Sequence, residues 1–517
     1  MSPPNHQDPG KLAQERAALA ERQHKKDKWQ YRFTSETVIA ALRGNEVGDA
    51  SLLVAALKNR FVFDAKRRIY FRFEGGHWHK DLENEALAAA GTVLREAYSQ
   101  EAMRQYQVAT DPKTDEETKK NALTLHERCN RRLDKVNTIR RQKSVLELAC
   151  TGKNGLVVTG DEWNSDPWLL QAMDTVIDLR TGVGRPGLPG DYINKAAPTV
   201  WKGFSEGAPG WGIALVEIFD QNWELISYVQ RVLGAALVGK PSQQEFYIFW
   251  GEGRNGKGTI LETLKEVLGE GLAGSIRSEM IMETRIGGGN GADPELLDLQ
   301  GRRLVWTSET GDGKRLNTEK MKLFTGGDTL SSRYNYSNEI ISFKPTHTLF
   351  MLTNHKPRIA AGDTAVWDRL RLIPFTMRFV DNPAAPNEKP KKINLQESLL
   401  EERSAILAWL VQGCLDWQKR GLRPPQTVTD SSEEYRLDED FVQQFINECC
   451  TTGPAYKEQA KPLHDEFSKW FQDTYGAKAT PPNLRRFSER LRKMPGITRE
   501  EGRNVYFHGL ALTTNNR

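Results

Sequence analysis

A glycine-rich loop offers the clearest chemistry in the sequence. Residues 251–259 read Gly-Glu-Gly-Arg-Asn-Gly-Lys-Gly-Thr, after the apolar run 246–250 and before an amphipathic segment. Glycines let backbone N–H groups converge on phosphate oxygens, and Lys257 would reach the β- and γ-phosphates of ATP. The residue after the lysine, usually serine or threonine, is Gly258, and Thr259 follows one place later. A turn that binds no nucleotide is the alternative. The predicted phosphate-binding residues are Gly251, Gly253, Asn255, Gly256, Lys257, Gly258 and Thr259.

A carboxylate and an amide close two later apolar runs, each typical of a buried strand. Glu309 ends the first run and Asn354 ends the second. A carboxylate there can hold Mg²⁺ or polarise water, and an amide can hydrogen-bond the terminal phosphate or the attacking water. The carboxyl ends of parallel strands meet at one edge of a sheet, so we expect both beside Lys257, with Thr259 and Glu309 as Mg²⁺ ligands. A solvated glutamate and an ordinary turn are the alternatives. Ser308 stands where many such enzymes have a second carboxylate.

Two arginines follow in the extended segment 366–375. Arg369 and Arg371 are two residues apart and therefore share one side of an extended chain. An arginine supplied by a neighbouring subunit can neutralise charge in the transition state of phosphoryl transfer. Salt bridges to local carboxylates, such as Asp363 or Asp368, are the alternative.

The order of these motifs resembles the superfamily 3 helicases, and in particular the phage and plasmid primase-helicases related to the poxvirus primase-helicase. The resemblance covers roughly residues 50–517 and also includes segments 77–81, 173–182 and 326–328. It implies a ring of six AAA+-type ATPase modules, with ATP between subunits and single-stranded DNA through the centre. The family also suggests 3′→5′ movement.

The resemblance assigns a role to each candidate. Lys257 corresponds to the phosphate-loop lysine, Glu309 to the Walker B acid, Asn354 to the sensor, and Arg369 or Arg371 to the arginine finger. The active site would therefore be shared between two copies of the chain.

Two segments are the main candidates for DNA contact. The family's DNA-contacting hairpin lies between the Walker B and sensor strands, where basic and aromatic side chains suit phosphate contact and base stacking. Near the C-terminus, a basic helix followed by a hairpin is similar to winged-helix DNA readers. Ordinary hairpin packing and a solvated or protein-docking helix are the alternatives. A third basic stretch, 113–143, favours a solvated or subunit-facing helix. The predicted DNA-binding residues are Arg333, Tyr334, Tyr336, Lys344, Arg485, Arg486, Arg490, Arg492 and Lys493.

The composition is that of a soluble chain without a strong charge bias. The 517 residues include 72 Lys and Arg against 68 Asp and Glu, a formal net charge of +4. The five cysteines lack metal-site spacing, and their odd number argues against a disulfide framework. Neither a secretory leader nor an apolar run of about 20 residues is visible, so we expect a protein of the host-cell cytoplasm without membrane association.

The expected fold class is multidomain α/β: an AAA+-type P-loop ATPase core with an α+β N-terminal domain and a C-terminal winged-helix-like domain. We place a polar mobile tail at 1–48, the N-terminal domain at 49–200, a helical collar or linker at 201–240, the ATPase domain at 241–430 and the winged-helix-like domain at 431–517. Such a tail cannot contain the primase domain that longer family members carry upstream, so we expect priming by a separately encoded primase or polymerase.

The leading functional hypothesis is an ATP-driven helicase that acts on single-stranded or forked DNA during replication of a phage, plasmid or other mobile element. Two alternatives stay open. One is an ATP-dependent replication initiator that remodels DNA without processive unwinding. The other is a nucleotide-gated DNA-binding protein in which the departures at Gly258 and Ser308 have abolished hydrolysis.

Overall fold

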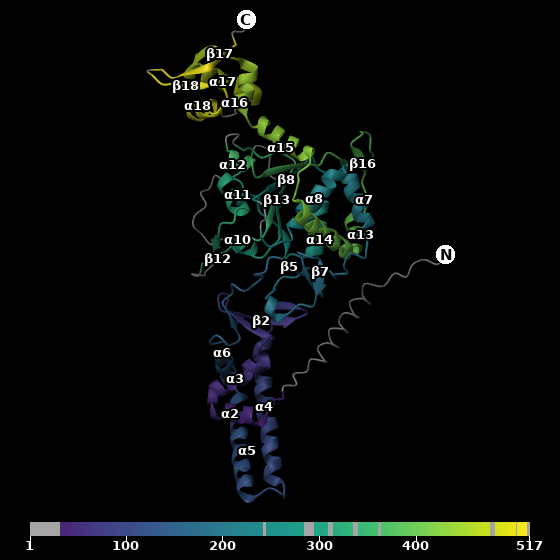
Figure 1. Ribbon diagram of the computed structural model, residues 1–517, viewed down its shortest axis with the longest axis vertical. Helices are drawn as coiled ribbons and strands as arrows, with labels where there is room; N and C mark the ends of the chain where they lie inside the picture. Colours follow the sequence, from purple (N-terminus) through teal and green to yellow (C-terminus); the bar gives the residue numbers. More distant parts are fainter. Residues whose placement is uncertain are drawn as a thin grey trace, which may run out of the picture. The chain divides into compact units, whose positions relative to one another are not determined.

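Two compact units divide the chain, and each has its own hydrophobic core. The first unit extends to Ser165 and also takes Gly187–Asn194, and the second comprises Asp166–Pro186 and the residues from Lys195 onward (Figure 1). The computed structural model describes residues 32–240, 244–283, 294–308, 314–333, 340–359, 363–475, 481–502 and 504–513.

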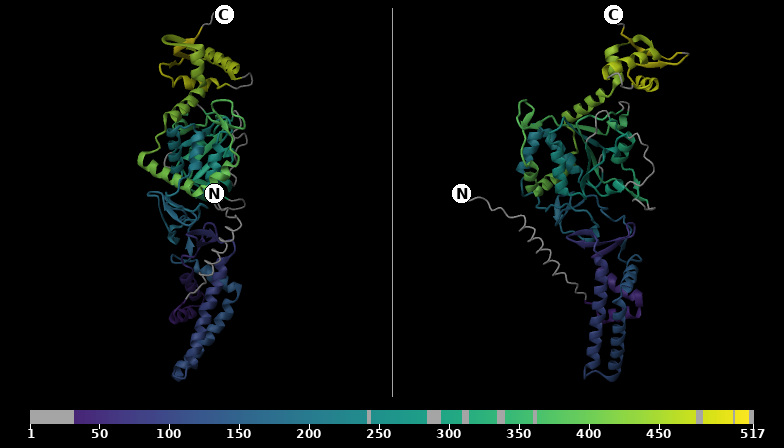
Figure 2. Two further views of the ribbon diagram at one scale, coloured as in Figure 1. Left: turned by 90° about the vertical axis from the view of Figure 1, so that its right-hand side faces the viewer. Right: turned by 180° about the vertical axis from the view of Figure 1, so that it is seen from behind.

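The first unit combines a helical bundle with a small sheet. Helices α4 and α5 form a long antiparallel hairpin (Figure 2), and small side chains on α4, such as Ala89 and Ala90, let the neighbouring helices approach closely. The helices are α2 (Ser35–Arg43), α3 (Asn45–Leu57), α4 (Glu85–Thr110), α5 (Glu116–Val136) and α6 (Ile139–Ala149), with a short 3-10 turn η1 (Pro189–Asp191). The sheet has the order β3-β2-β1-β4, from β1 (Phe61–Asp64), β2 (Ile69–Glu74), β3 (His77–Lys80) and β4 (Val157–Val158).

The end of the stretch predicted as a mobile tail, residues 1–48, is folded. Helix α2 and the start of α3 occupy it from Ser35 onward. Val38 and Leu42 of α2 are buried in the core of the first unit, and this burial holds the helix in place. The boundary therefore differs from the predicted one, because two apolar residues four apart already mark one face of a helix. Residues 1–31 lie outside the described part of the chain.

Two arginines of the basic stretch 113–143 form ion pairs with a buried carboxylate. Arg132 Nη1 donates to Asp49 Oδ1 at 2.8 Å, and Arg141 Nη2 donates to Asp49 Oδ2 at 2.6 Å. Asp49 is fully buried, so both guanidinium groups are needed to compensate its charge. These two arginines stabilise the bundle and are not available for DNA phosphates.

A five-stranded parallel sheet forms the centre of the second unit. Its order is β14-β8-β13-β10-β9, and every neighbouring pair is parallel. The strands are β8 (Phe246–Trp250), β9 (Ala273–Ile276), β10 (Leu304–Ser308), β13 (Thr348–Thr353) and β14 (Leu370–Pro374). Nearly continuous apolar sequence in β8, β10 and β13 follows from burial of both faces of the sheet. The prediction of buried strands at these positions is confirmed.

Helices pack on both faces of this sheet (Figure 1). The segment predicted as a separate collar supplies α7 and α8, which share one hydrophobic core with α9 and α14.

Within the described ranges, none of the helices combines the length and apolar character needed to cross a membrane. The helices are α7 (Pro209–Ile218), α8 (Trp223–Ala235), α9 (Lys257–Leu268), α10 (Pro294–Asp298), α11 (Thr318–Thr325), α12 (Thr364–Trp367), α13 (Leu395–Glu401), α14 (Arg403–Arg420) and α15 (Gln426–Asp438), with a short 3-10 turn η2 (Ser278–Met280).

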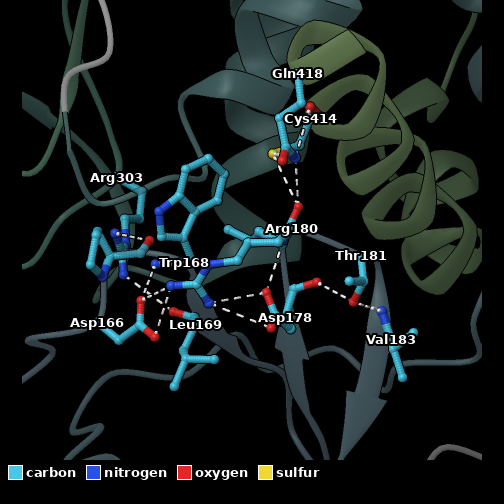
Figure 3. A network of polar contacts seen from close by, with 12 residues as sticks. Asp166, Trp168, Leu169, Asp178, Arg180, Thr181, Val183, Arg303, Cys414 and Gln418 are labelled. Atoms are coloured by element: carbon cyan, nitrogen blue, oxygen red, sulfur yellow. Dashed lines mark hydrogen bonds and ion pairs between the residues drawn. The ribbon is translucent and has the colours of Figure 1, made fainter.

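A small sheet lies within the range 49–200 assigned to the N-terminal domain, but it belongs to the second unit. It consists of β5 (Leu169–Gln171), β6 (Val176–Asp178) and β7 (Val183–Arg185). Figure 3 shows its attachment: Arg180 pairs with Asp166 at 3.0 Å, and Gln418 of α14 donates to Leu179 O at 2.7 Å. Arg303, which precedes β10, donates to Pro167 O at 3.1 Å. These long-range contacts set a boundary near residue 166 that composition alone did not mark.

Two strand pairs extend from the core of the second unit. β11 (Leu330–Ser332) and β12 (Ile341–Phe343) form an antiparallel pair between β10 and β13 in the sequence. β15 (Arg378–Val380) and β16 (Glu388–Pro390) form a parallel pair after β14.

The C-terminal part of the second unit has a separate apolar cluster. Phe467, Phe487, Leu491 and Phe507 are fully buried in it. Besides the predicted basic helix and hairpin, this part contains the strand β17, which is an edge strand of a sheet of order β17-β19-β18. Its elements are α16 (Phe441–Cys449), β17 (Cys450–Gln459), α17 (Ala460–Tyr475), α18 (Leu484–Leu491), β18 (Thr498–Glu500) and β19 (Tyr506–Leu512).

Candidate nucleotide site and DNA-contact surfaces

The glycine-rich loop connects β8 to α9 at the carboxyl edge of the parallel sheet. Gly253 and Gly256 have φ angles of +96° and +87°, a region that favours glycine. A Cβ on Gly256 would also lie 2.6 Å from the side chain of Ile218, so no larger residue fits there without movement. The loop thus turns sharply and directs the first N–H groups of α9 into the space above the sheet.

Lys257 is the first residue of α9, and its side chain points back over the loop. Its Nζ donates to Gly251 O at 2.6 Å and to Asn354 Oδ1 at 3.2 Å. The residue is only 6% exposed, and burial lowers the pKa of Lys257 to about 8. The structure therefore brings together two of the predicted site residues, Lys257 and Asn354, from segments far apart in the sequence.

A cavity of about 560 Å³ lies directly above these residues. Its lining includes the loop from Gly253 to Thr259, Asn354 directly after β13, and the last residue of β10, Ser308. In the strand register Ser308 lies level with Leu352, so β10 and β13 end at the same edge. Glu309 is the next residue after Ser308 and lies outside the described residues.

The position after Lys257 is open. No heavy atom lies within 4 Å of where a Cβ on Gly258 would be, so space does not demand glycine there. Thr259, one place later, lines the cavity and is half-buried. Thr259 is therefore the hydroxyl-bearing residue of the loop at this cavity. A positive-φ glycine loop, a buried lysine and a hydroxyl group together fit a nucleoside triphosphate with Mg²⁺.

A second cavity of about 700 Å³ shares Arg254, Gly256 and Thr259 with the first. Its apolar walls come from Ile218 of α7 and from Phe379 and Leu395. The Phe379 N–H donates to Arg254 O at 2.7 Å, which ties β15 to the loop. Sequence reasoning missed these residues, because three distant segments contribute them and none carries a recognisable spacing.

Nucleotide binding should depend on pH through Lys257. In the free protein its ammonium form is complete well below the pKa of about 8 and is lost as the pH rises through that value. Phosphate oxygens bind the ammonium form, so we expect the dissociation constant of a fluorescent ATP analogue to be flat near pH 6.5. Above pH 8 it should rise by up to about tenfold per pH unit. Adenosine, which lacks phosphates, should show no such rise, and an equal rise for both ligands would contradict this role.

The two candidate finger arginines lie at the other end of the sheet. Arg369 immediately precedes β14, and Leu370 and Arg371 lie level with Phe246 and Tyr247 at the start of β8. The glycine loop begins after the end of β8, so the structure does not bring either arginine to the Lys257 cavity of the same chain.

The hairpin residues are only partly described. Ser332 pairs with Ile341, and Leu330 pairs with Phe343. Arg333 continues from one end of this ladder, whereas the exposed Lys344 follows its opposite end, so the two are not adjacent along the ladder. Tyr334 and Tyr336 lie outside the described residues.

Most basic side chains of α18 and of the two residues after it are exposed to solvent, but one has an internal partner. Arg485, Arg486, Arg492 and Lys493 are exposed, and Arg485 pairs with Glu489 of the same helix. Arg490 differs, because its Nε donates to both carboxylate oxygens of Asp440 at 3.1 Å. Asp440 is 4% exposed and also caps α16. The position of Arg490 favours a structural ion pair over a phosphate contact.

No group of three or more His, Cys, Asp or Glu side chains that could hold a metal occurs among the residues that the structure describes. His77 and His79 on β3 stack with ring centroids 3.9 Å apart, and burial lowers the pKa of His77 to about 4.

A family model and several viral proteins match this chain. Residues 50–220 match the family described as "D5 N terminal like". "Putative helicase L207/L206" of Acanthamoeba polyphaga mimivirus is 27% identical over 463 residues, which cover 84% of this chain and 46% of that protein. "Primase D5" of Fowlpox virus is 25% identical over 234 residues, 43% of this chain and 29% of that protein. The chain spans about half the length of the curated relatives it matches.

Among solved structures, the apo NrS-1 C terminal region overlaps 90% of this chain and 99% of that chain. Its TM-score is 0.44 with 12% identity, a superposition too loose to inform individual residues. The domain match over residues 50–220, the similarity to a viral putative helicase along most of the sequence and the similarity to a viral primase together support a D5-like primase-helicase family for this chain.

Proposed function

We propose that this protein is an ATP-driven DNA helicase of the superfamily 3 type, with an AAA+-type ATPase core. The observation that carries the proposal is the meeting of Lys257 and Asn354 over a positive-φ glycine loop at the edge of a parallel sheet. A ligand bound at the carboxyl ends of parallel strands beside a helix N-terminus is the arrangement in which phosphates are held. The viral relatives that carry the name putative helicase support a nucleic-acid strand as the second substrate, for which we propose DNA.

Each residue of the site has its own proposed role. Backbone N–H groups of the loop and the Lys257 ammonium bind the β- and γ-phosphates, and Asn354 orients Lys257 and the terminal phosphate. Thr259 and Glu309 would hold Mg²⁺, which neutralises phosphate charge when bound. Glu309 polarises the attacking water. The adjacent 700 Å³ cavity has the apolar walls that a nucleoside requires.

The proposed assembly is a ring, with six copies as the family suggests, that moves 3′→5′ on single-stranded or forked DNA. The β11–β12 hairpin would contact the strand through Arg333, Tyr334, Tyr336 and Lys344. The C-terminal elements follow the order helix, strand, two helices and hairpin, which supports a winged-helix DNA-binding domain. We place the protein in the host-cell cytoplasm during replication of a virus or other mobile element, with a separate primase or polymerase as partner.

Stimulation of ATP hydrolysis by DNA tests this function. Phosphate release by the wild-type protein should increase several-fold when single-stranded DNA is added, because a motor couples turnover to its track. Binding of nucleotide and DNA with no phosphate release would instead identify a nucleotide-gated DNA-binding protein.

The exposed arginines of α18 and of its C-cap, Arg492, should supply salt-sensitive DNA affinity. Replacing Arg485, Arg486 and Arg492 by alanine removes three candidate phosphate contacts. The slope of log affinity against log salt should become shallower by about 2–3 units. The matched control is Arg490→Ala, which leaves Asp440 buried without its partner and should lower the melting temperature while changing the slope by at most about one unit. An unchanged slope in the triple variant would place the DNA site elsewhere.

A further inference from the structure

Helix α5 of the first unit carries basic side chains with two different environments. Arg132 points into the bundle, where its side chain is 6% exposed and pairs with the buried Asp49 at 2.8 Å. A second group, here called the α5 basic row, is exposed on the outside of the helix. Its members are Lys120, Arg128, Arg131 and Lys135. Folding of the bundle accounts for Arg132, but it does not account for the row.

The exposed residues line up along one side of the helix. Arg128, Arg131 and Lys135 follow Lys120 by 8, 11 and 15 positions, so at 3.6 residues per turn all of them fall within an arc of about 80°. At a rise of 1.5 Å per residue the row is about 22 Å long. Figures 1 and 2 show that the far end of the α4–α5 hairpin extends past α2, α3 and α6. The row is therefore a straight line of positive charge on a rigid element.

Carboxylates of the same helix compensate this charge only in part. Glu127 lies 3.7 Å from Arg131, and both side chains are 70% exposed, so this pair contributes little. Among the described residues, the other three members of the row form no ion pair with a carboxylate, although the exposed Asp134 lies on its flank. Like charges three or four positions apart on a helix repel each other. An external polyanion would relieve this repulsion.

The chemistry of the surrounding surface favours double-stranded DNA as that polyanion. Proteins that bind single strands combine basic groups with aromatic side chains on which bases stack. Helix α5 contains no Phe, Tyr or Trp, and its His126 ring packs against Tyr106 of α4 at 5.4 Å. A protein partner would need apolar contacts at the centre of its interface, whereas the uncharged residue within the row is Thr124. A duplex offers phosphates at a rigid spacing, and the row would span about 6 base pairs.

We infer that the α5 basic row binds the phosphate backbone of double-stranded DNA. This surface is distinct from the candidate DNA contacts of α18 and of the β11–β12 hairpin, which lie in the second unit. Phosphate contacts carry no direct sequence information, so binding is independent of base sequence. It also requires neither nucleotide nor ATP hydrolysis, and the inference therefore stands or falls separately from the proposed ATPase function.

The test measures binding of a blunt-ended duplex to the full-length protein without nucleotide, over a series of salt concentrations. The row variant carries Lys120→Gln, Arg128→Gln and Lys135→Gln. Glutamine has nearly the helix propensity of lysine and arginine, so α5 should persist, and the melting temperature checks this. Removing three phosphate contacts should make the slope of log affinity against log salt shallower by about 2–3 units and lower the affinity at low salt by at least about tenfold.

A charge-matched control removes three exposed cations that are scattered over the same unit. It carries Lys80→Gln, Arg95→Gln and Lys153→Gln, and therefore has the same net charge as the row variant. Its slope should differ from that of wild type by less than about one unit. If both triple variants lose duplex affinity equally, net charge and not the row determines binding, and the inference is wrong.

A single strand of the same length separates the two forms of DNA. The row variant should lose at least about tenfold more affinity for the duplex than for the single strand, because the stacking contacts of a single strand lie elsewhere. Equal losses would overturn the assignment to double-stranded DNA. If the triple variant melts below the wild type, Lys120→Gln and Lys135→Gln are measured singly, and each should lower the duplex slope by about one unit. Well-folded variants with the wild-type duplex slope would overturn the inference.

Discussion

Replacing Lys257 by alanine is expected to lower the rate of ATP hydrolysis by about 10²- to 10³-fold, the cost of losing one preorganised cation at a developing charge. The lysine is buried above the loop, with Nζ bound to Gly251 O and Asn354 Oδ1, so the alanine variant leaves these two oxygens facing the phosphates without a cation between them. Nucleotide affinity should therefore fall as well. Phosphate release and titration of a fluorescent ATP analogue measure the two effects.

The control for this variant lies on the same helix. Lys265 of α9 pairs with the exposed Glu270 and does not line the phosphate cavity. Lys265→Ala should change the rate by less than about threefold, because exposed ion pairs contribute little. If Lys257→Ala and Lys265→Ala behave alike, the loop does not hold the reacting phosphates.

Replacing Glu309 by glutamine is expected to separate binding from turnover. The amide keeps the size of the side chain but cannot polarise water as a base, so kcat should fall by about 10²- to 10⁴-fold. Nucleotide affinity should stay near that of wild type, because Lys257 and the loop are unchanged. Single-turnover hydrolysis and equilibrium binding measure the two quantities on one preparation.

Ser308 offers the matched control for Glu309. It is the last residue of β10, it is exposed, and it lines the same cavity. Ser308→Ala should leave kcat within about threefold of wild type, which would show that the single carboxylate at position 309 suffices. A Glu309→Gln variant that hydrolyses ATP at the wild-type rate would remove Glu309 from the mechanism.

The sequence was informative where local pattern and chemistry coincide. An apolar run, a glycine loop and an amphipathic helix predicted β8, the loop and α9, because each step has a local physical cause. The polar residues that end buried runs predicted that Asn354 would lie beside Lys257, since parallel strands share an edge. Their contact at 3.2 Å agrees with that expectation.

The sequence pattern does not predict contacts between residues that lie far apart in the chain. Arg490 looked like its basic neighbours on α18, but its partner Asp440 lies 50 positions away, and nothing local marks that pair. β17 was missed because its residues are mostly exposed or half-buried, which hides the alternation of a strand. Arg369 and Arg371 look alike in the sequence, but Arg371 pairs with Glu245 at 2.9 Å, whereas Arg369 donates to Gln244 Oε1 and Lys322 O. These partners come together only through the sheet register and the packing of α11.

Strand separation on forked DNA tests the central claim most directly. A labelled fork with both single-stranded tails is incubated with assembled wild-type protein and ATP, and released strand is measured over time. We expect release with ATP, none with a non-hydrolysable analogue and none with Lys257→Ala. A fork that keeps only its 3′ tail should be unwound and one that keeps only its 5′ tail should not. A wild-type protein that assembles on the fork and hydrolyses ATP but releases no strand would contradict the helicase and identify a remodelling initiator instead.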